Sequence, residues 1–244
     1  MLANFSRLNG REYICDECGN LYVKEGEIIK RLSIFDKHFY NLRVFSGVPV
    51  LEIDGLRMQP VKDFGTPLDY SRELIRALKI KRSYIVIDTC MGLGYTALEA
   101  ARKAALVRTF EVSKAVIMLA QMNPFSQRLF ELKTVRIEHG DITEKILNVP
   151  DGSIDVIIHD PPRLSIAPSL YSLSFYSQLA RVLRPFGKMF HYVGAMGRRR
   201  RRDVSKEVML RLSAAGFSVR KAKRLQGLFA FKRAPYIKDF KQLP

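Results

Sequence analysis

Four carboxylates follow the ends of short apolar runs in the middle of the chain, at Asp88, Glu111, Asp141 and Asp160. Two glycines, Gly92 and Gly94, come shortly after the first carboxylate and precede an alanine-rich stretch. Glycine is needed where a Cβ would hold the backbone away from a ligand, and a helix that follows offers unpaired N–H groups. Carboxylates at strand ends can accept hydrogen bonds from ribose hydroxyls or an adenine amino group. The spacing therefore predicts a nucleotide-like ligand, and the alternative is a tight turn that binds nothing.

The segment Asp160-Pro161-Pro162-Arg163 joins a carboxylate to a rigid backbone. Each proline fixes its own φ and removes a hydrogen-bond donor. The Asp160 carboxylate and an outward-turned Pro161 carbonyl can then accept hydrogen bonds from an amino group and aim its lone pair at an electrophile. Asp160 is also placed to take a proton. In the alternative interpretation the prolines only end a strand and Arg163 is solvated.

These residues need a sheet to bring them together. Runs of strand type at 84–87, 105–111, 135–138, 154–159 and 188–193 alternate with helical patterns at 97–105, 113–122, 174–183 and 203–215. A last pair of runs, 217–221 and 228–232, reads as a hairpin through Gln226-Gly227. Such alternation predicts an α/β fold with a mostly parallel sheet and one antiparallel strand. Ligands bind beyond the carboxyl ends of such strands, so we expect the four carboxylates at one edge.

Residues 1–62 differ from residues 63–244. They alternate short β-like runs with glycine turns, which predicts a small, mostly β N-terminal module or extension before the sheet domain. Cys15 and Cys18 have the spacing of a zinc knuckle, but a structural zinc needs four ligands and the chain has no second pair. We therefore expect no metal within one chain, and Cys15 and Cys18 stay candidates only for a site shared across a dimer. A helix over 63–79 should begin with Thr66 as its cap and Pro67 in its first turn.

Charge is the informative part of the composition. The chain of 244 residues has 41 Lys and Arg against 24 Asp and Glu, a net charge of +17. This excess favours a polyanionic partner, with RNA the leading candidate, although basic proteins also carry solvated charge. Five consecutive arginines follow the fifth predicted strand and are expected to guide a phosphate backbone, at Arg198, Arg199, Arg200, Arg201 and Arg202. No apolar run approaches a membrane span and no signal-peptide pattern begins the chain, so a cytoplasmic protein is expected.

Residues 93–96 (Leu-Gly-Tyr-Thr), 123–126 (Asn-Pro-Phe-Ser) and 159–163 (His-Asp-Pro-Pro-Arg) occur in an order with a familiar counterpart. They resemble segments of the class I S-adenosylmethionine-dependent methyltransferases, and within them of an uncharacterised archaeal group. The resemblance covers roughly residues 57–231 and implies a Rossmann-like sheet of seven strands. One departure is Cys90, which stands where the family's first glycine usually lies.

The resemblance also implies roles for individual residues. S-adenosylmethionine is expected to contact Asp88, Thr89, Gly92, Gly94, Thr96, Glu111, Val112, Asp141 and Ile142. Asp160, Pro161, Pro162, Arg163 and His191 are expected to serve the transfer, while a buried, hydrogen-bonded His191 is an equally good interpretation. In similar amino-methylating enzymes an aromatic residue that stacks on the base holds the position of Arg163. A guanidinium there can stack, or can bind a phosphate or carboxylate.

The sequence thus predicts an S-adenosylmethionine-dependent methyltransferase that N-methylates a nucleobase in structured tRNA or rRNA. Methylation of carbon 5 of a pyrimidine is disfavoured because it needs a cysteine nucleophile, and none follows Asp160. Three alternatives stay open: a small-molecule methyltransferase, an aminopropyl transferase of the spermidine-synthase kind, and a nucleic-acid-binding module without catalysis.

Overall fold

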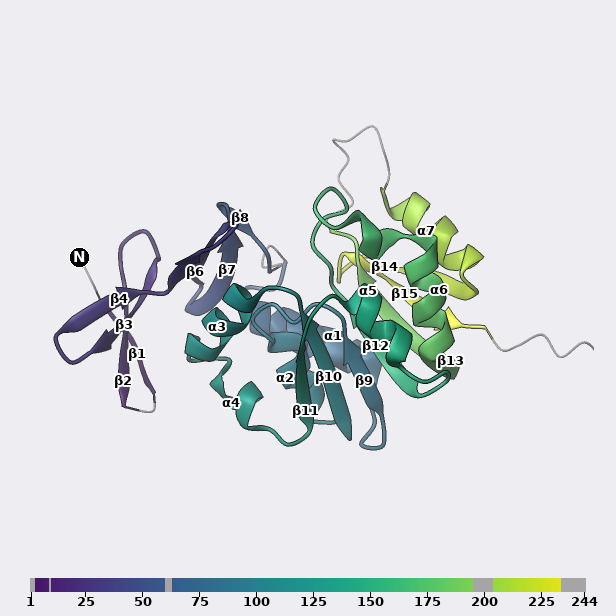
Figure 1. The fold of residues 1–244 in the computed structure, drawn as a ribbon, viewed down its shortest axis with the longest axis horizontal. Helices are drawn as coiled ribbons and strands as arrows, with labels where there is room; N and C mark the ends of the chain where they lie inside the picture. The colour runs from purple at the N-terminus through teal and green to yellow at the C-terminus, as the bar shows by residue number, and fades with distance from the viewer. Residues whose placement is uncertain (1–2, 9, 60–62, 195–203, 234–244) are drawn as a thin grey trace, which may run out of the picture.

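A computed structural model describes residues 3–8, 10–59, 63–194 and 204–233. Its centre is a seven-stranded sheet in the order β11-β10-β9-β12-β13-β15-β14 (Figure 1). The strands are β9 (Ile85–Asp88), β10 (Leu106–Glu111), β11 (Val135–His139), β12 (Ile154–His159), β13 (Leu183–Tyr192), β14 (Phe217–Ala222) and β15 (Gly227–Lys232). Only β15 runs antiparallel to its neighbours β13 and β14, which confirms the predicted mostly parallel sheet.

Helices cover both faces because neighbouring residues of a strand point to opposite sides. Val86 packs with the helices α1 (Pro67–Leu78), α2 (Tyr95–Ala101) and α3 (Lys114–Met122), while Ile87 packs with α6 (Leu173–Val182) and α7 (Val204–Ala214). The short helices α4 (Gln127–Glu131) and α5 (Ile142–Lys145), and the 3-10 turns η1 (Ile146–Asn148) and η2 (Pro168–Tyr171), complete the connections. The sheet is therefore buried on two sides, and its ligand sites are left to the edge.

The capping signals at the first helix act as predicted. The Asp69 amide donates to Thr66 Oγ1 at 3.1 Å, and Pro67 occupies the first turn of α1. The helix ends where Lys79 takes the left-handed conformation at φ 47°. This helix therefore keeps a fixed start beside the carboxyl edge of the sheet.

The start of the fifth strand was predicted wrongly. β13 begins at Leu183, not at Lys188, because Leu183 already pairs with Ile154. The next pair is Val156 with Lys188, so 184–187 bulge out within the strand, and Phe186 has a φ of 63°. Residues 184–187 are thus an insertion in a strand, directly after the end of α6 at Val182.

The N-terminal part forms two four-stranded antiparallel sheets. One contains β1 (Ala3–Leu8), β2 (Arg11–Cys15), β3 (Leu21–Glu25) and β4 (Ile28–Arg31), and the other β5 (Ser33–Phe35), β6 (Phe39–Phe45), β7 (Val48–Ile53) and β8 (Leu56–Arg57). They lie beside α3 and α4 (Figure 1) and share the core of α1 to α3. Tyr95 donates to the Pro49 carbonyl at 2.7 Å, and Gln127 donates to Tyr13 at 2.8 Å. The division at residue 62 lies outside the described residues and stays a prediction.

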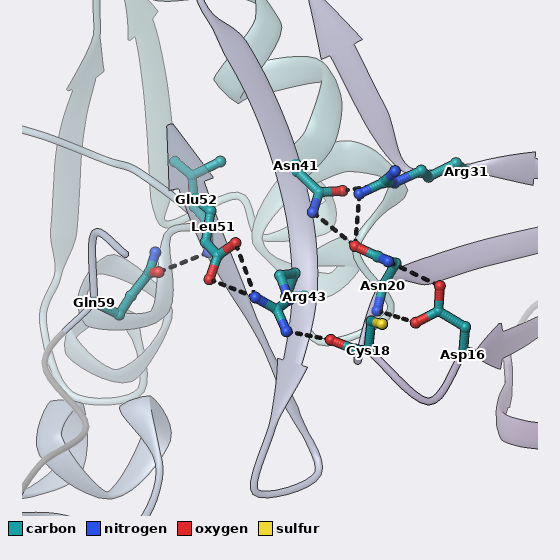
Figure 2. A network of polar contacts seen from close by, with 9 residues as sticks. All are labelled: Asp16, Cys18, Asn20, Arg31, Asn41, Arg43, Leu51, Glu52 and Gln59. Carbon is teal, nitrogen blue, oxygen red and sulfur yellow. Dashed lines mark hydrogen bonds and ion pairs between the residues drawn. The ribbon is translucent and has the colours of Figure 1, made fainter. Parts of the chain in front are cut away.

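A polar network joins the two N-terminal sheets around the Cys15–Cys18 turn (Figure 2). Asp16 accepts from Asn20, whose side-chain oxygen accepts from Arg31 and Asn41. Arg43 donates to the Cys18 carbonyl and pairs with Glu52. Within the residues that the structure describes, no group of three or more His, Cys, Asp or Glu could hold a metal ion. Hydrogen bonds thus shape this turn.

Among the described helices, none is long and apolar enough to cross a membrane.

Candidate donor and acceptor site

The strand register brings the predicted carboxylates to one edge of the sheet. Asp88, at the end of β9, pairs with Thr109 of β10 and with Ile158 of β12. The chain order of the sheet reverses between β9 and β12, and in open α/β sheets this is where the ligand crevice lies. Asp88 and Asp160 therefore stand on either side of the reversal.

Asp88 is fully buried and only half satisfied. Its Oδ2 accepts from Thr96 Oγ1 at 3.2 Å and from Thr109 Oγ1 at 3.1 Å, while Oδ1 has no partner among the described residues. Burial raises the Asp88 pKa to about 7, against the opposing effect of these hydrogen bonds. An unpaired buried carboxylate oxygen is costly unless a ligand supplies a donor or a positive charge.

The two glycines after β9 have different functions. A Cβ on Gly92 would have nothing nearer than Gln59 Nε2, at 3.8 Å, so this residue leaves open space. A Cβ on Gly94 would fall on the Leu129 side chain, so this glycine lets α4 pack against the start of α2. Both have positive φ, 53° and 76°, which favours glycine. Gly92 is therefore the one that leaves room for a ligand.

Glu111 holds the open loop in place. Its Oε2 accepts from the Gly92 amide and its Oε1 from the Ser113 amide, each at 3.0 Å. Burial raises the Glu111 pKa. The adjoining Val112 is 66% exposed. Each carboxylate oxygen keeps a lone pair, so Glu111 can brace the loop and still accept from a ribose hydroxyl.

The third strand end has a similar arrangement. Asp141 caps α5 by accepting from the Thr143 amide at 2.8 Å and from its hydroxyl at 2.9 Å. Ile142, the next residue, is buried. Together with Glu111 and the Gly92 loop, these residues make up the part of the edge where the sequence predicts the methyl donor, called the donor half below.

Gln59 belongs to this half and was missed by sequence reasoning. Its Oε1 accepts from the Leu51 amide at 2.7 Å (Figure 2). Its Nε2 is the atom that lies 3.8 Å from the position of a Cβ at Gly92. No described residue accepts a hydrogen bond from that Nε2. Nothing in the spacing of the central motifs could find Gln59, because tertiary packing carries it there from the N-terminal part.

The part of the edge where the sequence predicts the methyl acceptor, called the acceptor half below, is built around Asp160. Pro161 is buried, Pro162 is half-buried and Arg163 is exposed. The Pro162 carbonyl accepts from the Tyr171 hydroxyl at 2.9 Å, which fixes the segment. Burial raises the Asp160 pKa to about 7, and the Asp88 charge adds to that rise.

Two tyrosines line the space beside Asp160. Tyr70 is 2% exposed, and its hydroxyl has no partner among the described residues. Its ring meets Tyr192 edge-on, with centroids 6.2 Å apart. Burial and the Asp160 charge raise the pKa of both phenols, so they stay protonated. Tyr192 donates to Gln226 at 3.4 Å, and Gln226 in turn donates to Asp63 at 2.5 Å.

A buried layer of imidazoles lies behind the Asp160 segment. His159 bonds Thr89 Oγ1 at 2.7 Å and the Leu170 carbonyl at 3.0 Å, and its ring lies 4.3 Å from that of His191. His191 bonds Tyr176 at 2.8 Å. Burial lowers the pKa of both histidines, to about 4 at His159. His191 is therefore part of this layer and Thr89 bonds to it, so both support the loop from within.

The basic residues divide between the two ends of the sheet. Lys221, Lys223 and Arg224 lie where β14 turns into β15, at the carboxyl edge, whereas Lys232 and Arg233 lie at the opposite edge. Arg198 to Arg202 fall outside the described residues. The described part of the chain thus places three of the C-terminal cations beside the acceptor half.

Comparison with known proteins agrees with this architecture. No family model matches the chain. A protein of Listeria monocytogenes with a provisional assignment as an S-adenosylmethionine-dependent methyltransferase superposes with a TM-score of 0.50 and 12% identity, over 68% of this chain and 99% of its own. A spermidine synthase in complex with the transition-state analogue AdoDATO gives a TM-score of 0.66 and 18% identity, over 82% of this chain and 72% of its own. The chain has the Rossmann-like fold of the class I S-adenosylmethionine-dependent methyltransferases, which spermidine synthases share.

Comparison with related sequences identifies the family of the chain. The uncharacterized protein MJ1233 of Methanocaldococcus jannaschii is 42% identical over 222 residues, which are 90% of this chain and 76% of its own. The chain belongs to the family of that archaeal protein. Polyamine aminopropyltransferase 2 of Streptomyces coelicolor is 30% identical over 133 residues, 51% of this chain but only 24% of its own length.

Proposed function

We propose that this protein is an S-adenosylmethionine-dependent methyltransferase that alkylates a nitrogen atom, with structured RNA as its acceptor. The observation that carries the proposal is the pair of carboxylates, Asp88 and Asp160, across the point where the sheet order reverses. Both have a raised pKa, and Asp88 has an oxygen without a partner. A sulfonium cation bound between them would stabilise both anions.

On the donor side, the residues present fit an adenosyl group. Gly92 leaves space, Glu111 offers oxygens to ribose hydroxyls, and Asp88 offers a free oxygen to an ammonium. Bound S-adenosylmethionine would supply an already activated methyl group. The residues of the protein then need only position and desolvate the reacting atoms.

On the acceptor side, Asp160 accepts a hydrogen bond from the incoming amine and orients its lone pair. Tyr70 presents a second polar atom from a buried position. A carboxylate with a pKa near 7 is also suited to take the proton that the alkylated nitrogen releases. The imidazole layer holds the Asp160 segment in place through His159 and Thr89.

The distribution of charge supports RNA as acceptor. Residues 63–244 contain 32 Lys and Arg against 16 Asp and Glu, whereas residues 1–62 contain 9 against 8. The net positive charge thus belongs almost entirely to the part of the chain that carries the site. Such a concentration steers a polyanion toward it.

Transfer of an aminopropyl group is a second candidate. The spermidine synthase superposes over more of this chain than the methyltransferase does, and the Streptomyces coelicolor relative is an aminopropyltransferase by name. The acidic and phenolic groups Asp63, Asp160, Tyr70 and Tyr192 also suit an aliphatic amine.

Two measurements separate the candidates. Calorimetric titration with S-adenosylmethionine and with its decarboxylated analogue should show preference for the former. Mass spectrometry of tRNA and rRNA nucleosides from a strain that lacks the protein should reveal one missing methylated nucleoside. Preference for the decarboxylated donor together with an unchanged nucleoside profile would favour aminopropyl transfer.

A further inference from the structure

We propose that Arg163 forms an anion subsite beside Asp160, so that the acceptor is an amine that also carries a phosphate or carboxylate group. This inference rests on the proposed transfer to nitrogen and adds the chemical class of the acceptor. It sets the acceptor apart from free polyamines, which carry only positive charge.

The groups beside Asp160 suit the amine end of such an acceptor. Asp160 and the buried, unpartnered hydroxyl of Tyr70 both accept hydrogen bonds, and Tyr192 packs edge-on against Tyr70. Asp63 lies at the same place through Gln226, which bonds both Asp63 and Tyr192. Asp160, Tyr70 and Asp63 each offer an oxygen atom to an N–H group of the incoming amine, so recognition of this end needs no cation of the protein.

The backbone that carries Arg163 is fixed on both sides. Its carbonyl accepts from the amides of Ile166 at 2.8 Å and Ala167 at 3.1 Å, and the carbonyl before it accepts from Tyr171. The side chain therefore leaves a rigid turn three residues after Asp160 and cannot drift away with its loop.

The guanidinium of Arg163 has no acidic partner among the described residues. Three other arginines in the same half of the molecule have acidic partners, Arg181 with Asp151, Arg184 with Asp155 and Arg211 with Glu207, whereas Arg220 lies over the Phe231 ring. The Arg163 charge nevertheless reaches Tyr192, since it opposes the rise in the Tyr192 pKa that burial and the Asp160 charge cause. One phenol thus senses both the carboxylate and the guanidinium.

Elementary electrostatics then decides between acceptors. A second ammonium placed beside Arg163 would be repelled, and more strongly near a protein surface than in bulk water. A phosphate or carboxylate in the same place gains a charge-assisted, often bidentate, contact. Lys221 and Lys223, both exposed at this edge, extend the positive rim.

The test compares Arg163→Gln and Arg163→Asp with Arg82→Gln in the full chain saturated with S-adenosylhomocysteine. Arg82 is a matched control because it is also exposed and lacks a described acidic partner, but it precedes β9 at the opposite edge. Three probes are titrated: a labelled RNA hairpin, adenosine monophosphate and spermidine. Donor affinity is measured separately, so a failure of the proposed donor site is seen independently.

Arg163→Gln should weaken at least one anionic probe about tenfold, and Arg82→Gln should change it less than about twofold. Arg163→Asp should weaken it further and tighten spermidine. Loss of affinity for the hairpin alone identifies the bound group as a phosphate within RNA. Loss of affinity for adenosine monophosphate as well identifies it as the anionic group of a small molecule. The proposal is overturned if neither anionic probe binds, if neither loses affinity in Arg163→Gln, or if spermidine binds the wild type most tightly.

Discussion

At the scale of single residues, the site depends on carboxylates that are kept partly protonated. Asp88 and Asp160 both have a pKa of about 7, chiefly because burial disfavours their charged forms. A group of this kind costs stability at neutral pH, and proteins retain such groups where function needs them. The raised pKa values of these carboxylates therefore have consequences for both activity and stability.

Replacing Asp160 with Asn should abolish most of the activity while donor binding survives. The amide cannot take a proton, and general-base catalysis commonly contributes about 10²- to 10⁴-fold. Activity of the wild type should rise with pH through about 7 as Asp160 ionises. The pH profile of kcat/KM tests this, and a profile that is flat between pH 5 and 9 would contradict the role of Asp160.

Replacing Asp88 with Asn should stabilise the free protein at pH 8. The folded-state pKa is about 7 and the ordinary value is 3.8, so the folded form binds the proton more strongly. The contribution of Asp88 to stability is then greatest below about pH 4 and is lost as the pH rises toward 7. We expect a gain of about 1–3 kcal/mol at pH 8 that disappears at pH 4. Urea unfolding of both proteins at both pH values measures the difference, and an Asp88→Asn variant that gains as much stability at pH 4 as at pH 8 would refute it.

At the scale of elements, the loop between β9 and α2 unites packing and binding. Gly92 leaves space for a ligand, while Gly94 is needed because α4 packs against it through Leu129. The two glycines look alike in the sequence, and only the fold distinguishes them.

Gly94→Ala should destabilise the protein by about 1–3 kcal/mol, since the new methyl group would overlap Leu129 at a positive φ. Adding Leu129→Ala should recover part of that loss, because it removes the overlapping side chain. Thermal unfolding of the two single variants and the double variant gives the coupling. Strict additivity of the two effects would show that the contact does not explain the glycine.

Much of the arrangement of helices, strands and turns was predictable from local features of the sequence. The Thr66 cap, the alternation of strands and helices and the Gln226-Gly227 turn were all placed from residue types and spacing. The bulge within β13 and the position of Gln59 were not, because each depends on a tertiary partner: Ile154 pairs with Leu183, and Leu51 holds Gln59. Within the site, spacing gave the strand-end carboxylates, but it gave no sign that Thr89 bonds His159.

At the scale of the whole molecule, charge and fold work together. The N-terminal sheets are nearly neutral and deliver Gln59 to the donor half, while the net charge belongs to residues 63–244. The N-terminal part is thus expected to serve the donor and the C-terminal part the acceptor.

Replacing Arg198 to Arg202 with Gln should weaken RNA binding and reduce the slope of log affinity against log salt by about 3–4. A control variant with the same change in net charge replaces five other cations with Gln. These are exposed at the amino edge of the sheet: Lys79, Lys81, Arg82, Arg102 and Lys103. Filter binding at several salt concentrations measures both slopes. Equal slopes for the two variants would show that binding follows net charge and not its position.

Binding of an S-adenosyl donor at the Gly92 loop is the central requirement of the proposed function. Calorimetric titration of the wild type, Gly92→Asn and Gly26→Asn with S-adenosylmethionine tests it. Asn tolerates the left-handed conformation that both glycines adopt, at φ 53° and 62°, and nothing lies within 4 Å of a Cβ at Gly26. We predict one donor per chain for the wild type and Gly26→Asn, and at least about tenfold weaker binding for Gly92→Asn. Absence of binding by the folded wild type to both S-adenosylmethionine and its decarboxylated analogue would contradict the account.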